Sequence, residues 1–279
     1  MLDGGFLILR RRDFLVFLKL ISNSLLRLIS GSLHISQYIP MKTPNVKVSV
    51  IMPAYNTAPS IDLAIQSVLD QKKVPFELLI GDDASTDGTW GKIQNHVSDP
   101  RVRAFRFTRN QGVAVTRNRL IAKARGKYLS FCDADDILLP SNLFVLSRIL
   151  DRRPSVGVVY GDLYWRSLRG RLKIKHRFMP KKSWDLLGGC FNNCGTLIRR
   201  SAMRKAGGYR DQFKFLEDCD LFLRLSESTH FHFHSGRPLY LQKQSRGSLS
   251  DQPLKKQRET SRILLRDTLQ RRYGRKIKW

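Results

Sequence analysis

The chain has 279 residues, of which 42% are hydrophobic and 26% are charged, a composition that excludes disordered and collagen-like proteins. The length allows one large domain or two small ones. Lysine and arginine total 50 against 23 aspartates and glutamates, and the net charge of +27 favours an anionic partner such as nucleic acid, an anionic membrane surface or an acidic substrate.

Residues 1–40 combine an apolar run at Phe14–Leu18 with five basic and two acidic residues. The uncharged stretch between Asp13 and Lys19 has five residues, whereas a membrane-spanning helix needs about 20. Three interpretations stay open: sequence upstream of a native start at Met41, an amphipathic helix lying on a membrane, and an ordinary packing helix.

Strand and helix signals alternate from residue 46 to residue 160. Runs rich in β-branched and aromatic residues predict five strands: Val46–Met52, Phe76–Ile80, Val102–Phe107, Tyr128–Phe131 and Val156–Tyr160. Apolar residues at helical spacing follow Ser60, and further helices are predicted after Ser85 and over Val113–Ala124 and Asn142–Leu150. This alternation predicts a parallel α/β sheet.

The alternation of strand and helix signals is less regular after residue 160. Residues 161–182 suggest a basic hairpin or a flexible flap, because residues 166–182 contain eight basic and no acidic residues. Helices are predicted at Ser201–Ala206 and Glu217–Leu225, with a strand at His230–His234 between them and the tail. From about residue 255 a basic helix is expected, with an apolar stripe of Ile263, Leu264, Leu265 and Leu269.

The four cysteines exclude a disulfide scaffold, and they lack the CxxC spacing of a zinc knuckle. We expect all four to be reduced thiols in a cytoplasmic protein: Cys132, Cys190, Cys194 and Cys219.

Two acidic motifs follow predicted strands, where open α/β sheets bind their ligands. Asp82 and Asp83 could accept hydrogen bonds from a ribose or a base, or could simply cap the next turn. Asp133, Asp135 and Asp136 repel one another, and a divalent cation such as Mg²⁺ or Mn²⁺ would offset that repulsion and bind a diphosphate.

A third acidic motif, Glu217-Asp218, begins a predicted helix. The helix dipole alone could explain it, but beside a metal–diphosphate site one of these carboxylates becomes a candidate general base. The glycine-rich motifs of dinucleotide-binding and P-loop proteins are absent from the sequence. A nucleotidyltransferase-like enzyme and a nucleic-acid-binding α/β protein remain as alternatives, the second motivated only by the net charge.

These motifs, in this order and spacing, resemble those of the family-2 glycosyltransferases of the GT-A fold. The matching segments are Val48–Asn56, Gly81–Thr89, Asn110–Gly112, Arg117–Asn118, Ala124–Gly126 and Asp133–Asp136. The resemblance continues more weakly through Gly207–Tyr209, Glu217–Asp218 and Ser248–Ser250.

The resemblance implies a Rossmann-like, mostly parallel sheet flanked by helices, with a smaller acceptor-side subregion. The nucleotide-sugar-binding half is then residues 46–150, and the half with the acceptor site and the catalytic base is 151–250. The resemblance does not cover residues 1–40 or the last 25 or so. From the residues alone, we expect 251–279 to form a basic C-terminal helix or tail and 1–45 to be an N-terminal extension.

Site residues follow from the resemblance position by position. It implies nucleotide-sugar binding by Pro53, Tyr55, Asp82, Asp83, Arg117 and Asp133. It places Asp135 and Asp136 near a Mn²⁺ or Mg²⁺ ion and makes Asp218, with Glu217 beside it, the catalytic base. Lys243 and Ser245 stand where the family usually has arginine and histidine, and Gly188–Asn193 are expected on the acceptor side.

The implied reaction inverts the anomeric carbon as a sugar moves from a nucleoside-diphosphate sugar, expected to be UDP-linked, to a hydroxyl of a cell-surface glycan or lipid-linked acceptor. No specific nucleic acid is expected as a partner. The basic hairpin and tail are expected to dock on an anionic membrane, which places the protein in the cytoplasm, peripheral to the inner face of the cell membrane.

Overall fold

The chain divides into two units, Met1–Pro44 and Asn45–Trp279. The computed structural model describes residues 45–177, 193–213, 215–244 and 254–274. The expectations for residues 1–40, Gly188–Asn192, Ser245 and Ser248–Ser250 lie outside the described residues. Among the helices that are described, none has the length and apolar character needed to cross a bilayer.

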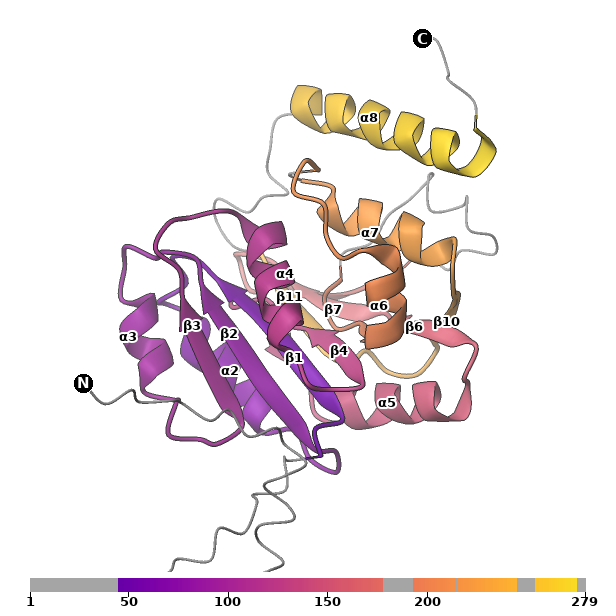
Figure 1. Cartoon of the computed structure of the whole chain (residues 1–279). Coiled ribbons are helices and arrows are strands. Elements are labelled where there is room, and N and C mark those ends of the chain that lie inside the picture. The colour runs from indigo at the N-terminus through magenta and orange to yellow at the C-terminus, as the bar shows by residue number, and fades with distance from the viewer. Residues whose placement is uncertain (1–44, 178–192, 214, 245–253, 275–279) are drawn as a thin grey trace, which may run out of the picture. The chain divides into compact units, whose positions relative to one another are not determined.

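A seven-stranded, mostly parallel sheet forms the centre of the second unit (Figure 1), as predicted. Its strands stand in the order β10-β6-β9-β4-β1-β2-β3. Their bounds are β1 Val48–Ala54, β2 Phe76–Asp82, β3 Val102–Arg106, β4 Tyr128–Phe131, β6 Val156–Gly161, β9 Leu197–Arg199 and β10 His230–His234. Only β9 runs antiparallel to its neighbours, β4 and β6.

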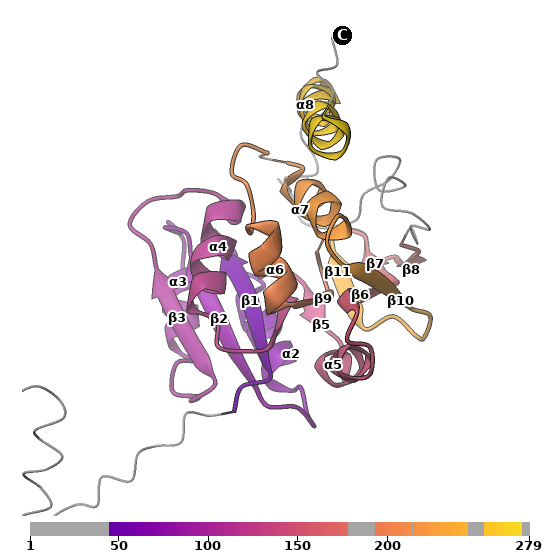
Figure 2. The ribbon, with the colours of Figure 1, turned by 45° about the vertical axis from the view of Figure 1, so that its right-hand side comes forward.

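Helices cover both faces of this sheet because side chains alternate along each buried strand. Val48, Val50 and Met52 of β1 pack with one group of helices, whereas Ile51 packs with the other. The first group is α2 (Ile61–Leu69), α3 (Thr89–Gln94) and α5 (Asn142–Arg152). The second is α4 (Val113–Lys123), α6 (Arg200–Ala206) and α7 (Glu217–Ser226), and Figure 2 shows the two layers.

A second sheet has four strands in the order β5-β11-β7-β8. They are β5 (Ile137–Leu138), β11 (Tyr240–Lys243), β7 (Leu163–Arg166) and β8 (Leu172–Lys175). β7 and β8 form an antiparallel pair closed by a turn in which Gly170 has a φ of 78°. This pair is the predicted basic hairpin.

The C-terminal helix α8 (Leu254–Tyr273) lies against α7, and the pattern prediction for it was partly wrong. Leu264 is buried, but Ile263 is exposed, so the buried face is narrower than the predicted stripe. Ion pairs supply much of the contact instead, since Arg271 and Arg272 both pair with Glu227. Arg210 also joins Asp267 of α8 to the buried Asp220 of α7.

The expectation for the cysteines needs one correction. Cys132 and Cys194 are free thiols, as predicted, and both are buried, whereas Cys219 is bonded in a disulfide. No CxxC spacing marks such a pair in the sequence, so the bond depends on how the chain folds.

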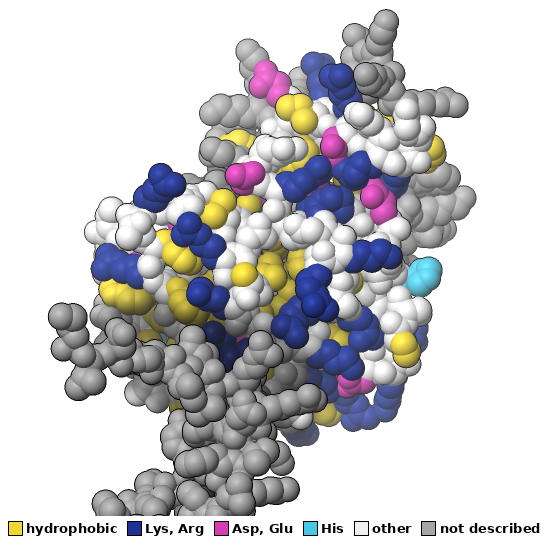
Figure 3. All heavy atoms as spheres, in the orientation of Figure 1, with side chains coloured by type: hydrophobic (Ala, Val, Ile, Leu, Met, Phe, Trp, Pro, Cys, Tyr) yellow, Lys and Arg dark blue, Asp and Glu magenta, His cyan; other side chains and the backbone are white. Residues whose placement is uncertain are grey.

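Lysine and arginine side chains are spread across the face shown in Figure 3, with acidic side chains scattered among them.

Candidate active site

The carboxyl ends of β1 and β2 bring four of the predicted donor-binding residues to one edge of the sheet. β1 carries Pro53 and leads to the exposed Tyr55, and β2 ends at Asp82 and leads to Asp83. The two strands are parallel and paired at Ala54 and Asp82, so both loops start at the same level. This placement agrees with a nucleotide site at the strand ends.

Asp83 is buried and holds the loop in front of α4. Its carboxylate accepts backbone hydrogen bonds from Gln111 at 3.1 Å and Gly112 at 2.8 Å. Gly112 has a φ of 89°, a backbone conformation that glycine adopts readily. Asp82 accepts a hydrogen bond from the Ser85 backbone at 3.2 Å and pairs with Arg106 at 3.3 Å. Both carboxylates therefore shape the loops around the expected site.

Asp136 lies in a buried pocket of polar groups supplied by β11 and by the segment before β9. Its Oδ2 accepts a hydrogen bond from the Tyr240 hydroxyl at 2.8 Å, and its Oδ1 accepts one from the Lys243 backbone at 2.8 Å. Burial, followed by repulsion from Asp135 and Asp133, raises the pKa of Asp136 well above its usual value.

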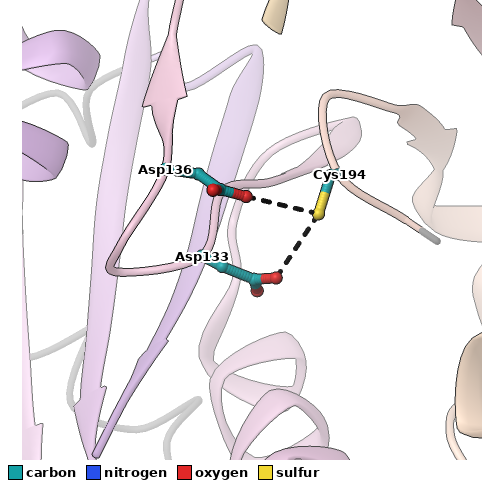
Figure 4. A group of neighbouring side chains, drawn as sticks. All are labelled: Asp133, Asp136 and Cys194. Carbon is teal, nitrogen blue, oxygen red and sulfur yellow. Dashed lines mark hydrogen bonds between the residues drawn. The ribbon is translucent and has the colours of Figure 1, made fainter. Parts of the chain in front are cut away.

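Cys194 connects Asp136 to Asp133 (Figure 4). Its thiol lies 3.4 Å from Asp133 Oδ2 and 3.6 Å from Asp136 Oδ2, within reach of both as a donor. A thiol has one proton, so it donates to only one of these oxygens at a time. The three possible ligand atoms all lie within 4.8 Å of one another.

The two carboxylates of this group fit a divalent cation, whereas the Cys194 thiol, whose pKa burial raises well above its usual value, is not a ligand that Mg²⁺ or Mn²⁺ prefers. Carboxylate oxygens are ligands that Mg²⁺ and Mn²⁺ prefer. A cation between Asp133 and Asp136 would relieve the repulsion between these carboxylates, which the single thiol proton of Cys194 relieves only in part. The described group consists of Asp133, Asp136 and Cys194, without the predicted Asp135. Asp135 is close enough to raise the pKa of Asp136, so it adds negative potential beside the group.

Arg117 of α4 joins the acidic loop to the start of α7. Its Nη2 lies 2.9 Å from Asp133, and its Nη1 lies 3.2 Å from Glu217 and 3.3 Å from Asp218. The side chain is only 4% exposed, and its guanidinium lies 5.4 Å from the centre of the Tyr209 ring. A buried guanidinium needs such partners, and here one cation serves three carboxylates.

Asp218 stands in the first turn of α7 with a side chain that is 15% exposed. Its Oδ2 accepts a hydrogen bond from the Asn193 backbone at 3.2 Å. Burial raises its pKa, and Arg117 acts in the opposite direction. The side chain of the neighbouring Glu217 is 10% exposed, and burial, with repulsion from Asp218, raises its pKa to about 7.

The site therefore combines residues that the sequence predicted with others that it did not. Asp133, Arg117, Glu217 and Asp218 meet in one ion cluster, and Asp136 is joined to it through Cys194. Cys194 and Tyr240 were not predicted, since their roles depend on contacts between distant segments. No local pattern marks a buried tyrosine 104 positions from the carboxylate that it binds.

Several known proteins are similar to this chain in sequence or in fold. The family model for glycosyl transferase family 2 matches residues 49–207. Among curated proteins, the chain is 32% identical over 183 residues to the Escherichia coli protein named "UDP-Glc:alpha-D-GlcNAc-diphosphoundecaprenol beta-1,3-glucosyltransferase WfgD". That match covers 64% of this chain and 68% of WfgD. The chain spans only 26%, 61% and 36% of the length of three other curated relatives.

Solved structures support the fold. S. aureus TarS 1–349 in complex with UDP-GlcNAc superposes with a TM-score of 0.66 at 20% identity, covering 81% of this chain and 67% of that one. The mannosyltransferase PcManGT from Pyrobaculum calidifontis, in complex with GDP-Man and Mn²⁺, gives 0.57 at 17% identity, covering 84% and 66%. The family-model match and the relationship to WfgD together show that the chain belongs to glycosyl transferase family 2, with the GT-A fold.

Proposed function

We propose that this protein is a metal-dependent, inverting glycosyltransferase. It moves a sugar from a nucleoside-diphosphate sugar to a hydroxyl of a cell-surface glycan or lipid-linked acceptor. The names of the similar proteins support a UDP-linked donor, since WfgD is named for UDP-Glc and TarS was crystallised with UDP-GlcNAc.

The donor's nucleotide binds at the carboxyl ends of β1 and β2. Tyr55 and Pro53 pack near the base, and Asp83, with Asp82 beside it, binds polar groups of the nucleoside. Asp133 lies on the ribose side, and Arg117 acts there by holding Asp133 at 2.9 Å.

Asp133 and Asp136 hold a Mn²⁺ or Mg²⁺ ion, and Asp135 adds negative charge beside it. The mannosyltransferase solved with Mn²⁺ has the same fold and supports this proposal. When bound, such a cation neutralises the charge that develops on the departing diphosphate.

Asp218 is the general base. Its carboxylate takes the proton of the acceptor hydroxyl as that oxygen forms a bond to the anomeric carbon. The bond from that carbon to the diphosphate oxygen breaks on the opposite side, which inverts the configuration. Arg117 and the Asn193 N–H favour the ionised Asp218 that this step needs.

One observation carries the proposal: Arg117 holds the candidate base, Asp218, beside Asp133 of the acidic cluster. A screen of UDP-, GDP- and dTDP-sugars, with Mn²⁺ or with EDTA, tests it by measuring release of the nucleoside diphosphate. We expect one donor class to be consumed with Mn²⁺ and none with EDTA. Equal release in EDTA would refute the metal requirement, and retained anomeric configuration in the product NMR spectrum would refute inversion.

A further inference from the structure

The β7–β8 hairpin carries an exposed surface that the proposed reaction does not use. We define the hairpin surface as the exposed side chains of Arg166, Leu168, Arg169, Arg171, Leu172, Lys173, Ile174 and Lys175. Five of these are cations, and no aspartate or glutamate occurs between residues 163 and 177. The surface is therefore strongly basic without internal neutralisation.

Apolar side chains are interleaved with these cations. Leu168 is 55% exposed, Leu172 60% and Ile174 46%. They make up three of the eight large hydrophobic residues that are exposed in the described part of the chain. Such a local concentration of exposed aliphatic side chains indicates a contact surface, because isolated exposed residues are ordinary but clusters are not.

The strand register and the edge position of β8 explain why these side chains are exposed to solvent. Tyr164 pairs with Ile174 and Arg166 pairs with Leu172, so Leu172 and Ile174 lie on one face of the hairpin with Arg166. β8 is the edge strand of its sheet, and all four of its residues are exposed. Figure 2 shows β8 at the outer side of this small sheet.

The turn end of the hairpin is hollowed. Trp165, Leu168 and Leu172 line an open depression whose other lining residues include Arg169, Arg171 and Lys173. Lys173 Nζ lies 4.6 Å from the centre of the Trp165 ring. A depression lined by both apolar side chains and cations suits an anionic headgroup attached to a hydrocarbon chain.

The other basic segment expected to dock, the C-terminal helix, has part of its charge engaged within the protein. Arg271 and Arg272 of α8 pair with Glu227, and its Leu264 is buried. In the hairpin, by contrast, cations and aliphatic side chains are exposed together. The hairpin therefore fits an anionic bilayer better than α8 does.

The hairpin also belongs to the four-stranded sheet whose strand β11 binds Asp136. β7 pairs with β11, and β11 supplies the Tyr240 hydroxyl and the Lys243 N–H that bind Asp136. We propose that the hairpin surface docks on an anionic lipid bilayer and so brings the site next to acceptors held in that membrane. The docking rests on the hairpin alone, whereas the acceptor class rests on the proposed function.

Sedimentation of the full chain with vesicles of phosphatidylcholine, with or without phosphatidylglycerol, tests this proposal. We expect binding only to the anionic vesicles, and release by added salt. Arg169→Gln, Arg171→Gln and Lys173→Gln should each lower the partition coefficient about fivefold, the equivalent of ~1 kcal/mol per basic residue near an anionic surface. Leu172→Ser combined with Ile174→Ser keeps every charge and should lower it roughly tenfold or more.

Leu63→Ser is the matched control, because Leu63 is equally exposed but lies on α2. Unchanged binding after both sets of hairpin substitutions would overturn the proposal, as would equal binding to neutral vesicles. Loss with the charge variants but not with the Leu172/Ile174 variant would overturn the part of the proposal that seats the aliphatic side chains in the bilayer, since the cations alone would then hold the vesicle surface. Binding of UDP with Mn²⁺, measured on every variant, reports separately on folding and on the proposed function.

Discussion

Arg117 Nη1 lies 3.3 Å from Asp218 Oδ1, although 101 positions separate the two residues in the sequence. The other terminal nitrogen, Nη2, donates to Asp133 at 2.9 Å, so a single side chain of α4 sets the separation between the acidic loop after β4 and the first turn of α7. This contact makes Arg117 a positioning residue for the proposed base.

Arg117→Lys should therefore reduce turnover even though it keeps the positive charge. An ammonium group lacks the planar fork that reaches Asp133 and Asp218 together, and removing one partner of a buried ion pair can cost about 3–5 kcal/mol. We expect kcat to fall at least tenfold with a lower midpoint of urea unfolding. Arg148→Lys, on the outer part of α5, serves as the control and should change neither. Wild-type kcat in Arg117→Lys would contradict the positioning role.

Asp136→Asn should abolish metal-dependent binding of UDP. The amide keeps the shape of the side chain but removes the charge that attracts a divalent cation. Titration calorimetry of UDP with Mn²⁺ and with EDTA measures the effect, with Asp151→Asn as a control on the surface pair with Lys47. Equal UDP affinity in Asp136→Asn and in the wild type would show that Asp136 does not hold the metal.

Glu217 should make stability depend on pH. Its pKa is raised to about 7 in the folded protein, above its ordinary value of 4.5, so the folded state binds this proton more tightly. The resulting stabilisation is fully present below about pH 4.5 and is lost as the pH rises through 7, by about 3 kcal/mol. Urea unfolding at pH 5 and pH 8 should show the wild type losing more stability than Glu217→Gln. Parallel losses in the two proteins would rule out this titration.

Gly195→Ala should disturb the surroundings of Asp136, because Tyr240, which binds Asp136, packs against Gly195. An added Cβ would lie 2.6 Å from the Cβ of Tyr240, and the φ of Gly195 is 63°. Because Tyr240 or the backbone at residue 195 must then shift, the hydrogen bond from Tyr240 to Asp136 is disturbed, and we expect a loss of about 1–3 kcal/mol in stability. The affinity for UDP with Mn²⁺ should fall with it. Gly91→Ala is the control, since an added Cβ there has no atom within 4 Å, and it should change UDP affinity little. An equally small effect of Gly195→Ala would exclude coupling between Gly195 and Asp136.

Much of the fold follows from local pattern. The strand predicted over Val46–Met52 is β1, Val48–Ala54, and the helix predicted over Val113–Ala124 is α4, Val113–Lys123. Both could be located because hydrophobic period and length are local properties. The helix α6 also ends where expected, at Gly207, whose φ of 79° suits glycine. Ile263 was misassigned because α8 is held partly by ion pairs, such as Arg271 with Glu227, so its apolar period does not define the buried face and Ile263 is exposed.

The site was less predictable than the fold. Asp133 and Asp218 could be singled out because acidic residues after a strand or at a helix start are visible in the sequence. The role of Arg117 as their common partner was not visible, since it depends on α4 and α7 meeting beside the same sheet edge. Cys194 and Tyr240 join the cluster from still other segments, and a buried tyrosine usually indicates only a core.

Asp218→Asn tests the central claim most directly, with nucleoside-diphosphate release and UDP affinity measured on the same preparation. The amide keeps the size of the side chain but cannot take a proton from the acceptor. We predict that sugar transfer falls to background while UDP binding with Mn²⁺ stays within a few-fold of the wild type. Near-normal transfer by Asp218→Asn would contradict the proposed mechanism.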